Sequence, residues 1–65
     1  MEIVVNGESE TIQPCTIAEL VAQKKLASGS LVVELNQQIL KEQQWSQTQL
    51  APGDRLELLS FVGGG

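Results

Sequence analysis

The chain has 65 residues, a formal net charge of −4, one cysteine and no histidine. A chain of this length forms one small domain, and a composition of 42% hydrophobic and 18% charged residues is typical of a globular protein. No apolar run approaches the roughly 18 residues of a membrane span, and no signal-peptide pattern opens the chain. We therefore expect a cytoplasmic protein that does not enter a membrane.

Charge and residue counts also exclude several kinds of site. Only four residues are lysine or arginine, so a nucleic acid partner is not expected, whereas an acidic surface favours a basic patch on another protein. Cys15 alone can form neither an internal disulfide nor a multi-cysteine metal site. Without histidine, the chain lacks the usual general base and zinc ligand. We expect no metal site and no independent catalytic site.

The first quarter of the chain predicts a β-hairpin. Apolar residues alternate imperfectly over residues 1–6, with Ile3 and Val5 on one face and Val4 on the other, as in a strand. Asn6-Gly7 is a strong signal for a tight turn. Residues 8–13 can then return antiparallel as a second strand, which Pro14 ends.

Residues 16–26, TIAELVAQKKL, predict a helix. Thr16 is a good N-cap, and Glu19 completes a capping box three residues later. An apolar stripe is formed by Ile17, Leu20 and Val21. Lys24 and Lys25 are expected in the last turn as a solvated helix end, where positive charge suits the helix dipole.

The second half predicts three more strands. Residues 31–36 form one, with Val32 on its outer face, and Ile39 begins a short one after a polar turn. Residues 41–47 suit a single helical turn that covers the core with Trp45. Residues 51–54, APGD, predict a turn, and residues 55–62 predict the last strand. Its inner face should hold Leu56 and Leu58, and its outer face Leu59 and Phe61.

This order of elements predicts a two-layer α+β domain. It is typical of the β-grasp, or ubiquitin-like, fold, in which the last strand pairs in parallel with the first and one main helix packs across a mixed sheet. We expect residues 1–61 to form this domain. Residues 62–65 are expected to be a flexible C-terminal Gly-Gly tail, because glycine loses the most backbone freedom on ordering.

The outer face of this sheet is predicted to bind a partner. Apolar side chains occur where a solvated face should be polar, and if their strands are neighbours they form one patch that leads to the tail. The residues of this predicted interface are Val4, Val32, Leu59, Phe61 and Val62.

Several stretches carry a family resemblance: MEIVVNGE, TIAEL, LVVELNQQIL, EQQWSQTQL, PGDRLELL and the terminal Gly-Gly. Along nearly its whole length the chain resembles the thiamine-pathway sulfur carrier proteins, the ThiS family. The combination of NQQIL with tryptophan and of GDRLELL with Gly-Gly is fairly specific, whereas a terminal Gly-Gly is shared by all activated ubiquitin-like carriers. Gly63 is a departure, since family members often carry a small residue such as alanine there.

The resemblance implies a chemical role for the carboxylate of Gly65, with Gly63 and Gly64 as a thin lead. A ThiF-type adenylyltransferase, similar to the ubiquitin-activating enzymes, would adenylate that carboxylate with ATP. Sulfur derived from cysteine through a cysteine desulfurase would then produce a thiocarboxylate, which delivers its sulfur to a ThiG-type thiazole synthase. The chain itself would bind no cofactor and would be a protein cosubstrate rather than an enzyme.

Other interpretations stay open at this point. The chain also suits the small sulfur-carrier subunit of molybdopterin synthase, or a β-grasp interaction module without tail chemistry. The three glycines suit a loose chain end or a cloning remnant as well. Cys15 can be a sulfur relay, although a packed thiol before the helix fits better. Trp45 fits a place in the core better than an interface anchor.

Overall fold

The computed structural model describes residues 1–60. Its elements, in chain order, are β1 (Glu2–Val5), β2 (Glu8–Thr11), α1 (Ile17–Gln23), a 3-10 turn (Ser28–Ser30), β3 (Leu31–Leu35), β4 (Gln38–Leu40), α2 (Glu42–Trp45) and β5 (Arg55–Ser60). These are the strands and helices that the sequence predicts, with small shifts at their ends. The predicted boundary between a domain of residues 1–61 and a tail of residues 62–65 lies outside the described residues.

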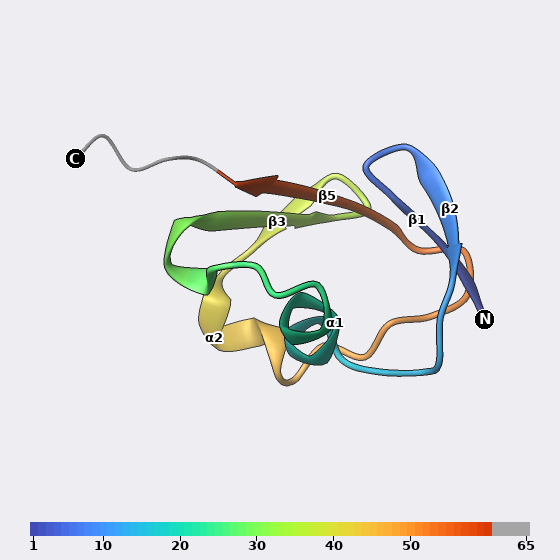
Figure 1. Cartoon of the computed structure of the whole chain (residues 1–65), viewed down its shortest axis with the longest axis horizontal. Helices are drawn as coiled ribbons and strands as arrows, with labels where there is room; N and C mark the ends of the chain where they lie inside the picture. The colour runs from blue at the N-terminus through green and yellow to red at the C-terminus, as the bar shows by residue number, and fades with distance from the viewer. Residues whose placement is uncertain (61–65) are drawn as a thin grey trace.

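The five strands form one mixed sheet in the order β2-β1-β5-β3-β4. β1 pairs in parallel with β5, while the β1–β2, β3–β4 and β3–β5 pairs are antiparallel. α1 crosses one side of the sheet, and α2 lies on that same side (Figure 1). The predicted β-grasp arrangement is confirmed, with the last strand at the centre of the sheet.

The core lies between the sheet and the helices. β1 and β5 turn alternate residues inward, so Ile3 and Leu56 are almost fully buried, and they meet Ile17 and Leu20 of α1. Burial of this apolar surface is the main force that holds the two layers together. The core consists of Ile3, Val5, Cys15, Ile17, Leu20, Val21, Leu31, Val33, Trp45, Leu50, Leu56 and Leu58.

α1 begins as predicted but ends earlier than predicted. The Thr16 hydroxyl accepts a hydrogen bond from the Glu19 N–H, and the Glu19 carboxylate accepts one from the Thr16 N–H, which completes the capping box. The helix stops at Gln23 because Lys25 takes a left-handed backbone conformation with φ of 57°. The N–H groups of Lys25 and Leu26 then donate back to helix carbonyls, in the pattern of a Schellman motif. The two lysines therefore follow the helix and are not in its last turn.

α2 is the single turn that the sequence predicts, and it places Trp45 in the core. The indole of Trp45 is 4% exposed, and its Nε1–H donates to the carbonyl of Leu40 over 3.2 Å. This hydrogen bond satisfies the polar atom that burial of the ring would otherwise leave without a partner. The predicted core role of Trp45 is confirmed.

The described residues contain no helix that is long and apolar enough to span a bilayer.

Candidate functional site

The candidate site is the end of β5 and the outer face of the sheet around it. β5 lies between β1 and β3, so the strand that leads into the C-terminal residues is held from both sides over its first half. Ser60 is the last described residue. The predicted site residues Phe61, Val62, Gly63, Gly64 and Gly65 lie outside the described residues.

The structure brings two of the predicted interface residues together. Val32 of β3 lies directly opposite Leu59 of β5 in the antiparallel register, and both point away from the core. Cross-strand partners of this kind have their Cβ atoms about 5 Å apart, so the two side chains form one surface. Leu59 is 50% exposed, which is a large exposure for a leucine on a central strand.

Ile39, which is not among the predicted interface residues, extends this surface. Ile39 lies opposite Glu34 in the β3–β4 pair and is therefore diagonal to Val32. Its side chain is 68% exposed. The sequence held part of the signal: of two adjacent apolar residues in a strand, Ile39 and Leu40, one must point outward. The structure packs Leu40 against the core and leaves Ile39 outside. We call Val32, Ile39 and Leu59 the outer apolar patch.

Val4 does not belong to this patch. The parallel register places Val4 beside Arg55, at the start of β5, whereas Leu59 is near its end. Between these two positions Glu34 and Glu57 face each other on adjacent strands. The three strands are neighbours as predicted, but Val4 is separated from the patch because β1 pairs only with the first two residues of β5.

Two carboxylates, those of Glu34 and Glu57, give the outer face a local negative charge. Glu34 and Glu57 are like charges directly opposite each other, an arrangement that weakens a strand pair. They line a shallow hollow of about 330 Å³ together with Val4, Gly7, Gln37, Arg55 and Leu56. An opposite charge placed between the two carboxylates would relieve their repulsion. The outer face therefore presents an apolar patch beside a negative centre.

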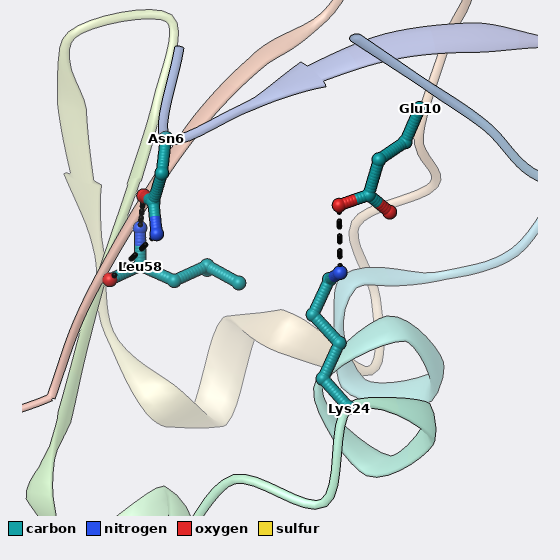
Figure 2. Close-up of polar contacts among 4 residues, drawn as sticks. All are labelled: Asn6, Glu10, Lys24 and Leu58. Carbon is teal, nitrogen blue, oxygen red and sulfur yellow. Dashed lines mark hydrogen bonds and ion pairs between the residues drawn. The ribbon is translucent and has the colours of Figure 1, made fainter. Parts of the chain in front are cut away.

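The end of β5 is held by the side chain of Asn6. The Asn6 Oδ1 atom accepts a hydrogen bond from the Leu58 N–H at 2.8 Å, and its Nδ2 atom donates to the Leu58 carbonyl at 3.4 Å (Figure 2). β1 cannot make these bonds with its backbone because the chain turns away at Asn6 and Gly7, whose φ angles are 51° and 83°. The side-chain amide of Asn6 thus makes the two hydrogen bonds to Leu58 that the backbone of β1 would make if this strand continued.

An ion pair lies on the same side of the sheet as α1. The Lys24 ammonium meets a Glu10 carboxylate oxygen at 2.7 Å, and so connects β2 with the end of α1 (Figure 2). This corrects the prediction that Lys24 is a solvated helix end. Sequence spacing did not reveal the pair, because the two residues meet only when the hairpin folds beside the helix.

Cys15 is buried, as its predicted packing role requires. Burial raises the pKa of the Cys15 thiol above its ordinary value of 9.0, and the negative charge of Glu19 raises the pKa further. A thiol held in its protonated form is a weak nucleophile. Within residues 1–60, no cluster of three or more histidine, cysteine or carboxylate side chains could hold a metal ion.

Comparison with known proteins identifies relatives of the whole chain. A model of the ThiS family matches residues 2–65. The sulfur carrier protein ThiS of Bacillus subtilis is 34% identical over 50 residues, which cover 77% of this chain and 76% of that protein. A thiazole synthase of Paramagnetospirillum magneticum is 32% identical over 66 residues, which cover the whole of this chain but only 20% of that protein.

Solved structures agree with these sequence relatives. The crystal structure of a thiamine biosynthesis protein (ThiS) from Geobacter metallireducens is 33% identical and superposes with a TM-score of 0.86 over the full length of both chains. An NMR structure of a thiamine biosynthesis protein from the same organism gives a TM-score of 0.83, with 33% identity and coverage of 88% of that chain.

Proposed function

Because this chain belongs to the ThiS family, we propose that it carries sulfur for thiamine biosynthesis on the carboxylate of Gly65. The observation that carries the proposal is the family match over residues 2–65, which includes the terminal glycines as well as the domain. We infer that this chain is a cosubstrate of other enzymes rather than an enzyme itself.

The proposed chemistry activates the carboxylate of Gly65 and then exchanges one of its oxygen atoms for sulfur. A carboxylate is a poor electrophile, so a ThiF-type adenylyltransferase first joins it to the phosphate of AMP, with release of pyrophosphate from ATP. A persulfide sulfur that a cysteine desulfurase supplies then displaces AMP and forms an acyl disulfide. A thiol such as cysteine cleaves its S–S bond, which leaves the thiocarboxylate and an ordinary disulfide. ATP is bound by the adenylating enzyme, and this chain requires no cofactor of its own. We place the reaction in the cytoplasm, with the ATP that it uses.

The chain contributes reach and a narrow terminus to this chemistry. Residues 61–65 can span at most about 18 Å beyond Ser60. Glycines have no side chains, so Gly63, Gly64 and Gly65 can enter a channel that would exclude other residues. The carboxylate could then reach an adenylation site first and the active site of a ThiG-type thiazole synthase later.

Affinity for these enzymes must come from the domain, since ordering a glycine-rich terminus opposes binding. The outer apolar patch and the adjacent Glu34–Glu57 pair provide a suitable surface. A partner that offers apolar side chains beside a basic group would bury the patch and neutralise the repelling carboxylates. We propose that Phe61 and Val62 continue this contact toward the site of the reaction.

Mass spectrometry tests the proposed role of Gly65. The carrier is incubated with the adenylyltransferase and the desulfurase of the same organism, cysteine and ATP. Exchange of one oxygen atom for sulfur should increase its mass by about 16 Da. The sulfur-loaded form should then support thiazole formation by the synthase in vitro.

Two variants are controls for this experiment. Deletion of Gly64 and Gly65, or addition of one alanine after Gly65, should abolish the mass increase while far-UV circular dichroism and the melting temperature stay unchanged. An unmodified mass of the natural chain under conditions where all the partner enzymes are active would contradict the proposal.

A further inference from the structure

The last residue of β5 presents an open strand edge. Ser60 lies opposite Leu31 of β3, but the hydrogen bonds between these strands alternate along the ladder. Arg55 bonds to the β3 side, since its carbonyl accepts from the Asn36 N–H, while Leu56 bonds to the β1 side through Asn6. Ser60 therefore has the same orientation as Leu56 and Leu58, with its N–H and carbonyl directed toward the β1 side.

No described residue pairs with Ser60 on that side. β1 pairs with β5 only at Arg55 and Leu56, and the amide of Asn6 then satisfies the backbone of Leu58. Beyond Asn6 the chain has already turned into the hairpin. On the β1 side, the edge of β5 is thus closed up to Leu58 and open at Ser60.

A groove runs beside this open edge. It has a volume of about 600 Å³ and is lined by Val5, Asn6, Glu8, Glu10, Lys24, Leu26, Leu58 and Ser60. Its apolar surface comes from Val5 and Leu58, which are buried, and from Leu26, which is half-buried. The Glu10–Lys24 ion pair (Figure 2) also lines it, with both charges already satisfied. Such a groove suits an apolar side chain of a segment that lies along the edge.

We propose that an extended segment of the thiazole synthase pairs with β5 at Ser60 as an added strand, and places an apolar side chain in the groove. This inference rests on the proposed function, because a protein that receives the C-terminal residues must approach the end of β5. Strand addition uses main-chain hydrogen bonds for affinity and a neighbouring pocket for specificity, and both are present here. The synthase is the favoured partner because the Paramagnetospirillum magneticum thiazole synthase includes a region similar to this whole chain.

Amide hydrogen exchange tests the pairing directly. Exchange is measured on the carrier alone and on its complex with the purified thiazole synthase of the same organism, with fragmentation that separates neighbouring amides. Ser60 should exchange rapidly in the carrier alone and at least tenfold more slowly in the complex. Leu59 is the internal reference: its amide faces β3, so it is protected in both samples. Equal exchange of Ser60 in both samples would overturn the proposal.

A pair of variants tests the same bond by affinity. Ser60→Pro removes the N–H on the open side and keeps the β3 ladder, because Ser60 does not donate to β3. Ser60→Ala removes only the hydroxyl group and is the matched control. Ser60→Pro should weaken binding to the synthase about tenfold, and Ser60→Ala should bind like the natural chain. Equal affinity of all three proteins would contradict strand addition, provided that their melting temperatures agree.

Other occupants of the edge give different results. Protection of Ser60 in the carrier alone that increases with protein concentration indicates a second copy of the chain, and it overturns the proposal. So does protection by the adenylyltransferase with none by the synthase. The proposed function is tested separately, because a chain that acquires sulfur while Ser60 stays unprotected in the synthase complex supports the carrier role and rejects the added strand.

Discussion

Among residues 1–60, four residues other than glycine take a left-handed backbone conformation: Asn6, Lys25, Asn36 and Gln37. Asparagine tolerates this region because its short side chain can bond locally, which explains Asn6 and Asn36 as turn residues. Lysine and glutamine have no such compensation. The turn between β3 and β4 therefore stores a small strain at Gln37, whose φ is 73°.

Replacement of Gln37 by glycine should relieve this strain. We expect Gln37→Gly to increase the free energy of unfolding by about 0.5–1 kcal/mol, measured by urea denaturation followed by the fluorescence of Trp45. Gln38→Gly is the control, because Gln38 lies in regular strand conformation in β4. The control should lower the free energy of unfolding by a similar amount. A loss of stability in Gln37→Gly would show that the turn is not strained.

Cys15 makes stability depend on alkaline pH. Its pKa is raised in the folded state by burial and then by Glu19, so the unfolded chain loses the thiol proton first. The folded state then binds more protons than the unfolded state, and stability falls as the pH increases above 9.0. The loss is complete once the pH exceeds the raised pKa of the folded state.

Urea denaturation at a series of pH values from neutral to alkaline measures this effect. The free energy of unfolding of the natural chain should decrease more steeply above the ordinary thiol pKa than that of Cys15→Ala. The variant is less stable overall because it leaves a small cavity, so the comparison concerns the slopes and not the absolute values. Parallel slopes would show that Cys15 titrates alike in both states.

At the scale of elements, the sheet depends on a side chain to complete its centre. β1 and β5 are the only parallel pair in the described sheet, and their backbone pairing is short. Asn6 extends it by two side-chain hydrogen bonds to Leu58. These bonds determine how far β5 is held on its β1 side, and therefore that the open edge lies at Ser60, which β3 alone pairs with among the described strands.

Two substitutions of Asn6 separate its contributions. Asn6→Gly keeps the left-handed turn and removes the amide, so it should lower the free energy of unfolding by about 1–2 kcal/mol. Asn6→Ala removes the amide and also disfavours a φ of 51°, which should cost about 1 kcal/mol more. The exchange rate of the Leu58 amide should increase in both variants. An unchanged Leu58 rate in Asn6→Gly would contradict a holding role for the amide.

At the scale of the whole molecule, the two faces of the sheet have different tasks. The inner face packs under α1 and α2 and provides the core, whereas the outer face exposes Ile39 and Leu59. The outer apolar patch lies at the end of β5 from which the chain continues to the glycines. A partner seated on the patch would therefore contact β5 next to Ser60, its last described residue.

Leu59→Glu and Ile39→Glu test the outer apolar patch. Both side chains are largely exposed, so the melting temperature should change little, while the rate of adenylation measured by pyrophosphate release should fall at least tenfold at limiting carrier. Ser9→Glu is the matched control, because Ser9 is exposed on β2 opposite Val4, on the same face and away from both the patch and the acidic pair. A similar loss of rate in the Ser9 variant would show that the partner covers the whole outer face.

Local signals in the sequence were sufficient for most of the fold. Asn6-Gly7 predicts the hairpin, Thr16 and Glu19 predict the start of α1, and Pro52 with Gly53 predicts a turn that the structure contains. Each signal works because the residues that cause the structure are neighbours along the chain. The end of α1 was predicted less accurately, because Lys25 takes the left-handed conformation at the position where a glycine usually marks the end of a helix.

The candidate site could be predicted only in part. Alternation along each strand indicates that Val4, Val32 and Leu59 point outward, and this required no knowledge of the sheet. Their separation into a patch and a distant Val4 depends on register, since β1 pairs only with Arg55 and Leu56 at the start of β5, whereas β3 pairs with β5 as far as Ser60. Ile39 joined the patch for the same reason, through its position opposite Glu34.

The sequence by itself determined the elements, their inner and outer faces, the family and the glycine terminus, because these depend on neighbouring residues and on motifs. Only the tertiary structure decided which side chains from distant segments meet. Distant segments meet in the Glu10–Lys24 ion pair and in the bond between the Asn6 amide and Leu58. The open edge at Ser60 likewise depends on where β1 and β3 lie beside β5. Such contacts are set by strand order and register, which the burial of a shared core selects for the molecule as a whole.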